Sequence, residues 1–220
     1  MLKFTSEQIQ KIQGLNPLTD SKFNYDPKSW QNLNENCKCL ISDFENIGIS
    51  RQDVINAFKC YFNSDNDSEF IRPFLLSMVW GFGNAGYGTY RTKSYIENDE
   101  NRNKIKLAID YIGGNEVDRL KKSFFELMEI KGLGISYLTK VLYFATRARQ
   151  ERDYAIIFDM KVADSLVKLT APKEIYEIIN IGPSSKFCDY IKYNNLIHKL
   201  AEENKIEPEN LEMYLFKQEF

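Results

Sequence analysis

Apolar residues recur every three to four positions along most of the chain, a spacing that predicts amphipathic helices. Capping signals mark several helix ends. Ser50 to Asp53 forms a capping box, Gly113 to Asn115 stops one helix and caps the next, and Pro208 suits the first turn of the last helix. The pattern predicts helices at 51–62, 68–80, 99–112 and 116–129, one ending near Arg147, and others at 160–169, from Pro172, at 184–203 and from Pro208.

Two segments break the helical pattern. The glycine-rich stretch "WGFGNAGYGTYRT" (80–92) is not expected to stay helical, and the apolar "YAIIF" (154–158) is the only candidate strand. A single strand makes no sheet, so the predicted fold class is all-α. We expect one domain over 1–220, with a cleft between two helical lobes formed by 1–95 with the C-terminal helices and by 96–170.

The composition excludes several classes of protein. With 220 residues, 43% of them apolar, the chain can bury its own core, and a net charge of −2 is unlike that of a polybasic tail. The four cysteines form no CxxC pair and there is one histidine, so no metal site is expected, and reduced thiols favour the cytoplasm. No apolar run reaches 18 residues, so no membrane partner is expected. The protein is predicted to be a monomer without a cofactor.

The segment "EIKGLGISYLTKVLYF" (129–144) joins two apolar helical patterns through a pair of glycines. Such a hairpin exposes backbone N–H groups at the start of the second helix, and with the helix dipole they attract an anion such as a DNA phosphate. Residues 131–173 carry eight lysines and arginines against four acidic residues, so this region is basic. The candidate DNA contacts are Lys131, Gly132, Gly134, Ser136 and Lys161. The spacing alone fits an ordinary helical hairpin with a solvated basic face equally well.

The stretch "GLGISYLTKVLYFA" followed by "IIFDMKVADSL" resembles the helix-hairpin-helix DNA glycosylases, the superfamily that includes the 8-oxoguanine glycosylases. The resemblance covers residues 127–166 and implies that Lys140 is a nucleophile and that Asp159 is an essential carboxylate at a helix start. Lys131 stands where the family often has proline. The segment from Gly134 to Lys140 is longer than usual, so a tight alignment would put Ser136 in the nucleophile's place. A lengthened hairpin and the phrase "TKVLYFA" resemble the archaeal branch, which favours Lys140, with Lys131 next in line.

This resemblance implies a DNA glycosylase that flips a modified base out of double-stranded DNA and cuts its N-glycosidic bond. A lysine nucleophile would add an AP-lyase step. The implied substrate is 8-oxoguanine, or a bulky phage base such as glucosylated hydroxymethylcytosine, which phage-defence relatives remove. The alternatives are a non-catalytic helix-hairpin-helix module that only binds DNA, and an unrelated helical protein.

Aromatic residues cluster within the glycine-rich stretch, where turns could present them to an extruded base. The candidate base pocket consists of Trp80, Phe82, Tyr87, Tyr90 and Arg91. The same residues could instead be core side chains that seal the two lobes.

Other polar residues are not expected in the site. His198 lies in a helical pattern, which is typical of a packed or surface histidine. The acidic residues near the C-terminus are predicted to be solvated helix ends: Glu202, Glu203, Glu207 and Glu209.

Overall fold

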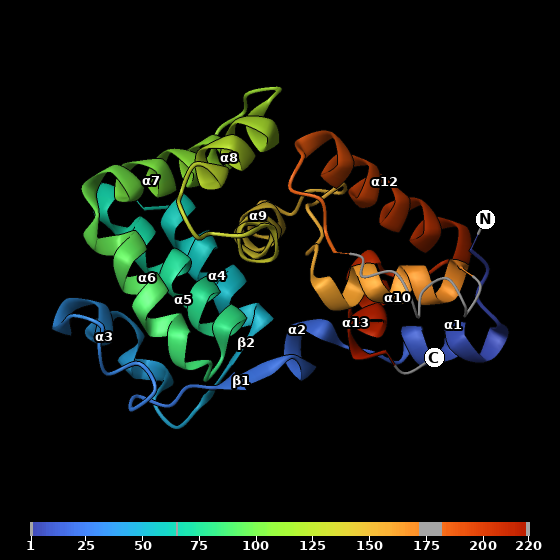
Figure 1. Ribbon diagram of the computed structural model, residues 1–220, viewed down its shortest axis with the longest axis horizontal. Coiled ribbons are helices and arrows are strands. Elements are labelled where there is room, and N and C mark those ends of the chain that lie inside the picture. Colours follow the sequence, from blue (N-terminus) through green and yellow to red (C-terminus); the bar gives the residue numbers. More distant parts are fainter. Residues whose placement is uncertain (1, 65, 172–181, 219–220) are drawn as a thin grey trace.

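The computed structural model describes residues 2–64, 66–171 and 182–218, and helices dominate this range (Figure 1). The N-terminal part contains α1 (Ser6–Gln13), α2 (Pro17–Asp20), β1 (Lys22–Asn24), α3 (Glu35–Ile41), the 3₁₀ helix η1 (Ser42–Phe44), β2 (Gly48–Ser50), α4 (Arg51–Phe62) and the 3₁₀ helix η2 (Asp67–Phe70). The middle contains α5 (Ile71–Phe82), α6 (Gly86–Glu97), α7 (Asp99–Gly113), α8 (Arg119–Met128) and α9 (Ile135–Ala148). The C-terminal part contains α10 (Met160–Thr170), α12 (Phe187–Asn204) and α13 (Pro208–Lys217). The predicted all-α fold class is confirmed.

The helices pack in two groups, which Figure 1 shows on either side of α9. In the central group, α3 to α9, helix α4 packs against α5 and α9, and α7 packs against α6, α8 and α9. In the terminal group, α13 contacts α1, α10 and α12. Helix α2 contacts both α4 and α13, so it bridges the groups. The boundary between these two groups falls after α9, because α4 and α5 pack on α9. The lobes expected at 1–95 with the C-terminal helices and at 96–170 remain a prediction.

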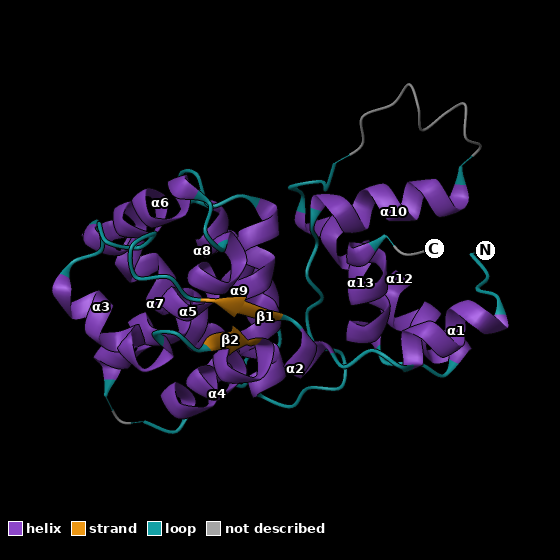
Figure 2. Ribbon diagram, turned by 90° about the horizontal axis from the view of Figure 1, so that it is seen from below, coloured by secondary structure: helices purple, strands orange, loops and turns teal. Residues whose placement is uncertain are grey.

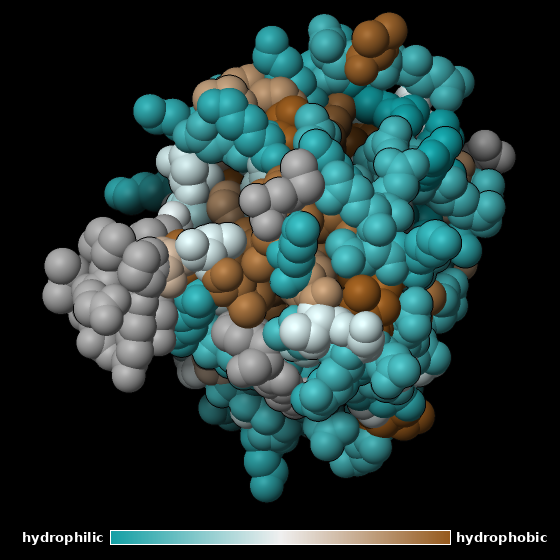
Figure 3. Space-filling model, turned by 90° about the vertical axis from the view of Figure 1, so that its right-hand side faces the viewer, coloured by the Kyte–Doolittle hydropathy of each residue, from teal (hydrophilic) through white to brown (hydrophobic). Residues whose placement is uncertain are grey.

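The first and last helices of the chain meet in the terminal group. The side-chain amide of Asn210 donates to the carbonyl oxygens of Ile12 (3.1 Å) and Leu15 (2.8 Å), which fixes the end of α1 against α13. Figure 2 shows α1 at the same end of the molecule as α10, α12 and α13, and the two strands in front of the helices of the other group. The outer face that Figure 3 displays is mostly hydrophilic, with apolar residues in smaller areas between the polar ones.

Helix α9 is the most enclosed helix of the central group. Ten of its fourteen residues are buried, and it is flanked by α4, α5, α7 and α8. A helix that is apolar on nearly all sides belongs in a core. The buried polar residues Thr139, Lys140 and Thr146 are the exceptions, and each forms a hydrogen bond with a group outside α9.

The glycine-rich stretch is helical, contrary to the prediction. Helix α5 continues to Phe82, and α6 begins at Gly86. The backbone turns at Gly83, whose φ of 59° favours glycine, so one short break is enough. Gly88 lies inside α6, where a Cβ atom would come within 2.6 Å of Phe82 Cβ, so this glycine allows the two helices to approach closely.

The segment "YAIIF" is extended but is not a strand. Side chains of α9 and α12 bind its backbone in place of a neighbouring strand. The amide donors bind Thr146 (Ala155 N, 2.9 Å), Asn194 (Ile156 N, 2.7 Å) and Thr139 (Phe158 N, 3.0 Å), and the carbonyl oxygens bind His198 (Tyr154 O, 2.8 Å), Tyr190 (Ile156 O, 3.1 Å) and Tyr193 (Ile157 O, 2.6 Å). His198 is thus a packed residue, as expected. The strands present, β1 and β2, pair antiparallel with Phe23 opposite Ile49, and at three residues each they carry no detectable pattern.

Several helix ends agree with the sequence signals. The Ser50 capping box is present, and Pro208 occupies the first turn of α13. Helix α12 begins at Phe187, later than predicted, and the Ser184 hydroxyl donates to Asp189 over 2.8 Å. The helix predicted from Pro172 lies outside the described residues. Within the described ranges, no helix combines the length and apolar character needed to cross a bilayer, and no three His, Cys, Asp or Glu side chains gather as metal ligands.

Candidate active site

Lys140 and Asp159 meet between the two groups of helices. The Nζ atom of Lys140 lies 3.1 Å from Oδ2 of Asp159 and donates to the carbonyl oxygen of Ser136 over 3.0 Å. The Lys140 side chain is 7% exposed and that of Asp159 is 19% exposed. Burial strengthens the attraction between the two charges, because little water screens it. The arrangement holds an amine and a carboxylate in contact at the edge of the core.

The extended segment carries Asp159 to this position. Asp159 follows Phe158 directly and is the N-cap of α10, where Oδ1 accepts from the Lys161 backbone N–H over 3.2 Å. Its other oxygen, Oδ2, faces Lys140. The two oxygens therefore have different functions, one fixing the side chain to α10 and the other facing the amine.

Lys140 rests against α5 at Gly81. A Cβ atom on Gly81 would lie 2.9 Å from Cδ of Lys140, closer than non-bonded carbon atoms normally approach. The ammonium group also lies 5.1 Å from the centroid of the Tyr137 ring, and Tyr137 stacks on Phe82 with 3.9 Å between ring centroids. Burial, followed by a hydrogen bond with Tyr87, raises the pKa of Tyr137, so its hydroxyl stays protonated. Gly81 and the Tyr137 ring, which is stacked on Phe82, form the surface on which the Lys140 side chain packs.

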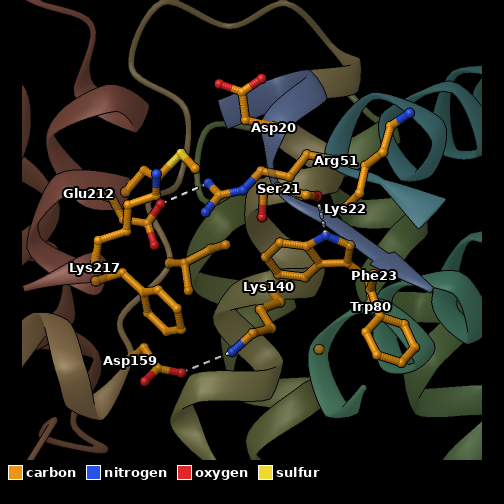
Figure 4. Close-up of a pocket in the computed structure, with 14 residues that line it drawn as sticks. Asp20, Ser21, Lys22, Phe23, Arg51, Trp80, Lys140, Asp159, Glu212 and Lys217 are labelled. Atoms are coloured by element: carbon orange, nitrogen blue, oxygen red, sulfur yellow. Dashed lines mark hydrogen bonds and ion pairs between the residues drawn. The ribbon is translucent and has the colours of Figure 1, made fainter. Parts of the chain in front are cut away.

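A cavity of about 350 Å³ opens beside the pair (Figure 4). Figure 4 shows Lys140 and Asp159 on one side of it, Arg51 and Glu212 on the opposite side, and the Trp80 indole between. Its lining comes from both groups of helices and from the segment that runs from α2 into β1. The lining residues are Asp20, Ser21, Lys22, Phe23, Arg51, Trp80, Gly81, Lys140, Ile157, Asp159, Glu212, Met213, Phe216 and Lys217. The mixture of aromatic, apolar and charged walls suits a flat polar ring.

Arg51 and Glu212 form a buried ion pair in the cavity wall. Nη1 of Arg51 lies 2.7 Å from Oε2 of Glu212, and the two side chains are only 3% and 2% exposed. The guanidinium lies 5.1 Å from the Trp80 ring centroid, and Trp80 donates through Nε1 to the Ser21 carbonyl oxygen over 3.0 Å. Burial raises the pKa of Glu212, and the charge of Arg51 opposes this effect. The pair joins α4 of the central group to α13 of the terminal group.

The predicted base-pocket residues separate in the structure. Trp80 lines the cavity. Phe82 is buried behind it against Tyr137, and Tyr87 packs edge-on against Phe82 at 5.7 Å. Arg91 lies 4.9 Å from the Tyr87 ring centroid and is exposed, as is Tyr90, at 73%. Of the five predicted residues, only Trp80 lines this cavity, and Phe82, Tyr87, Tyr90 and Arg91 lie outside its lining.

Sequence analysis missed most of the cavity wall. Phe23, Arg51, Glu212 and Phe216 come from segments far apart in the chain, and no sequence signal marked any of them as a site residue. Glu209, predicted to be solvated, is 5% exposed. It accepts from the Tyr143 hydroxyl over 2.7 Å and pairs with Arg147 over 3.0 Å, because α13 packs on the open face of α9.

The hairpin between α8 and α9 lies within the central group. Gly132 has a φ of 90°, and its carbonyl oxygen accepts from the Tyr95 hydroxyl over 2.7 Å. Gly134 is the N-cap of α9 and has no side chain to cap the helix, so the first backbone N–H groups of α9 remain available as hydrogen-bond donors. A Cβ on Gly134 would meet no atom within 4 Å, so the space beside this N-cap residue is open.

The other predicted DNA contacts lie at or near this site. Lys131 is exposed beside Gly132. Ser136 is half-buried one turn before Lys140, and its carbonyl oxygen accepts a hydrogen bond from the Lys140 ammonium. Lys161 is exposed at the start of α10, with its ammonium 4.7 Å from the Phe216 ring centroid. The hairpin donors and the Lys140 amine are thus presented by the same helix.

Comparison with known proteins identifies the family of the chain. Residues 16–216 match the sequence model of a protein family described as "Putative 8-oxoguanine DNA glycosylase OGG-like protein". No curated protein and no solved structure matches the chain. The matched range runs from α2 to α13 and includes the hairpin, Lys140, Asp159 and all of the cavity lining except Lys217. The chain therefore belongs to this OGG-like family of DNA glycosylases.

Proposed function

We propose that the protein excises a modified base from duplex DNA, using Lys140 as the nucleophile and Asp159 as the carboxylate that assists it. The observation that carries this proposal is the 3.1 Å contact between the two side chains at the wall of a cavity. A buried lysine that pairs with a carboxylate beside an open cavity has the placement of a reacting group. A module that only binds DNA needs no such cavity.

The hairpin would hold the DNA backbone. The free N–H groups at the start of α9 would bind a phosphate, and exposed Lys131 would add charge nearby. The target nucleotide would then rotate out of the duplex, and its base would enter the cavity beside Trp80. This places the sugar of the same nucleotide next to Lys140 and Asp159.

Bond exchange at the sugar would follow. The ammonium of Lys140 gives one proton to the departing base, and the neutral amine that results attacks C1′ while the C1′–N bond breaks and the base leaves with the bonding electron pair. The Asp159 carboxylate stabilises the positive charge that develops on the sugar and accepts the proton that the amine releases. The resulting aminal opens to a Schiff base, from which loss of the 3′-phosphate by β-elimination gives the AP-lyase product. If water attacks instead of the lysine, the Asp159 carboxylate accepts the proton from that water and the DNA strand stays intact.

The substrate is a modified base, with 8-oxoguanine as the first candidate and glucosylated hydroxymethylcytosine as the second. A panel of duplexes, each with one modified base, should show which base is released, and alkali then reveals abasic products. Excision of the glucosylated base would support a role in defence against phage.

The nucleophile is tested by borohydride, which reduces a Schiff base to a stable enzyme–DNA adduct. Lys140→Gln should abolish the adduct and leave duplex affinity nearly unchanged, whereas Lys131→Gln and Lys161→Gln serve as controls that keep it. Asp159→Asn should slow excision by about 100-fold or more, the scale of losing one electrostatic stabiliser. Base release by wild-type protein without any adduct would replace the lysine with water as the nucleophile. Duplex binding without base release on any duplex would favour the binding module.

A further inference from the structure

We propose that Arg51 reads the extruded base: its guanidinium donates to an acceptor on the edge of that base and selects a guanine-type base over an adenine-type one. This inference rests on the proposed function and names a determinant of its specificity.

The first observation is an unused donor on a buried side chain. Arg51 is 3% exposed and lines the cavity, and its Nη1 atom pairs with Glu212 at 2.7 Å. The Nε–H group of the same guanidinium has no hydrogen-bond partner in the described structure. A buried N–H without an acceptor costs free energy, so this guanidinium, which lines the cavity, keeps a donor beyond the one that Glu212 uses.

The second observation is that the guanidinium is fixed in place. It lies between two aromatic rings, 5.1 Å from the centroid of Trp80 and 5.3 Å from that of Tyr143. The Tyr143 hydroxyl is itself anchored, since it donates to buried Glu209 over 2.7 Å. A planar fork held between two rings and a carboxylate keeps one orientation before any ligand arrives, which favours selective hydrogen bonding.

A purely structural function explains this pair less well. A buried ion pair loses about as much in desolvation as it gains in attraction, and apolar residues of similar volume can stabilise a core equally well. This pair stands in a cavity wall, next to an aromatic ring, and opposite the amine that attacks the sugar. An arginine there gives the cavity a hydrogen-bond donor that apolar side chains would lack.

The chemistry of the guanidinium defines the ligand. Arginine presents only donors, so the edge that faces it must carry an acceptor. A guanine-type base has a carbonyl oxygen at C6, whereas an adenine-type base has an amino group there, and two donors would then oppose each other. The Trp80 ring beside Arg51 offers a surface on which such a base can stack. We therefore assign the carbonyl oxygen at C6 of the base as the acceptor that Arg51 binds.

The test compares four duplexes that contain 8-oxoguanine, 8-oxoadenine, glucosylated hydroxymethylcytosine or a preformed abasic site. Wild-type protein should release 8-oxoguanine about 10- to 100-fold faster than 8-oxoadenine, as expected for one good base contact. Arg51→Lys keeps the positive charge but loses the fork, and should reduce this preference to within a few-fold. Borohydride trapping on the abasic duplex should stay near the wild-type rate, because no base is present to be read. The double variant Arg51→Met, Glu212→Leu leaves no lone buried charge and should give the same result.

A matched control is Arg72→Lys. Arg72 also pairs with a carboxylate, Asp43 at 2.6 Å, and lies 6.0 Å from the centroid of the Phe44 ring, but it does not line the cavity. Its substitution should change neither preference nor trapping. The inference is overturned if Arg51→Lys keeps the full preference, or if its abasic trapping falls as far as its excision, which would make the pair structural. Release of the cytosine derivative but not of 8-oxoguanine by wild-type protein would also overturn it and leave the proposed function standing. A wild-type protein that neither releases a base nor traps the abasic duplex would remove both.

Discussion

The backbone N–H of Phe158 donates to the hydroxyl of Thr139 over 3.0 Å. Thr139 directly precedes Lys140, and Phe158 directly precedes Asp159, so one hydrogen bond joins the two segments immediately before the candidate reacting groups. The same hydroxyl donates to the Ile135 carbonyl oxygen over 2.8 Å, so it links α9 to the extended segment as both donor and acceptor. We therefore expect this bond to help set the separation between the amine of Lys140 and the carboxylate of Asp159.

Thr139→Val, which keeps the shape of the side chain, should loosen the pair. It leaves the buried Phe158 N–H without an acceptor, and we expect the free energy of unfolding to fall by about 1–3 kcal/mol. Borohydride trapping should slow as well, since Asp159 loses its fixed place. Thr170→Val is the control, because the Thr170 hydroxyl is exposed and binds only within its own helix. Unchanged stability and trapping in Thr139→Val would show that the bond is dispensable.

Gly81→Ala should displace the Lys140 side chain. The added Cβ would lie 2.9 Å from Cδ of Lys140, and an error of about 1 Å in the position of a reacting group can slow a reaction about 100-fold. We expect trapping to slow by roughly 10- to 100-fold while duplex affinity and melting temperature stay near wild type. Gly86→Ala is the matched control, since a Cβ there meets nothing within 4 Å. Equal trapping rates in both variants would show that Gly81 does not position the Lys140 side chain.

The two hairpin glycines should respond differently to substitution. Gly132 has a φ of 90°, so Gly132→Ala should lower the free energy of unfolding by about 1–2 kcal/mol. Gly134 has a φ of −71°, which any residue adopts, and open space beside it, so Gly134→Val is unstrained and should cost at most about 1 kcal/mol, because valine is a poorer N-cap than glycine. It should nevertheless weaken binding to all duplexes alike, by roughly fivefold to tenfold, because its side chain fills the approach to the α9 donors. Affinity should also depend weakly on salt, since backbone donors release few counterions. Normal affinity of Gly134→Val together with a steep salt dependence would place the DNA elsewhere.

Stability should depend on pH through Glu212. Because burial raises the pKa of this carboxyl above 4.5, the folded state binds its proton more tightly than the unfolded state does. The stability that this group contributes is therefore present below pH 4.5 and is lost as the pH rises through its pKa in the folded protein. Glu212→Gln cannot titrate, so the difference in unfolding free energy between wild type and variant should change across this window. Melting curves at several pH values measure it, with the exposed Glu207→Gln as the control; a constant difference would contradict the prediction.

The sequence predicted what depends on neighbouring residues. The helical repeats, the Ser50 capping box and the hairpin glycines are local signals, and most of the corresponding helices are present. Lys140 and Asp159 could be picked out because their segments follow one another in the chain and resemble a known motif. Gly83 and Gly88 were misjudged, since sequence alone does not tell which glycine breaks a helix and which lets two helices approach.

The inner wall of the cavity could not be predicted. Arg51 and Glu212 stand 161 positions apart, and a charged residue on a helix normally faces water. Their burial depends on how α13 packs against α4 and α9, which no local pattern encodes. The extended segment was mistaken for a strand for a similar reason: the side chains that bind its backbone, such as Thr139 and Asn194, lie on helices before and after it.

The contact between α1 and α13 has a consequence for how the chain folds during synthesis. Helix α1 is made before the other helices described, yet the Asn210 amide that binds Ile12 and Leu15 lies 198 positions after Ile12 in the chain. At about 5–20 residues per second, a ribosome needs on the order of 10–40 s to reach Asn210 after Ile12. The central group is complete once α9 has emerged, so it can fold early, while the α13 side of α9 and the apolar side of α1 wait for a partner. Closing so long a loop is slow, and we expect the nascent chain to be most accessible to chaperones and proteases during this interval.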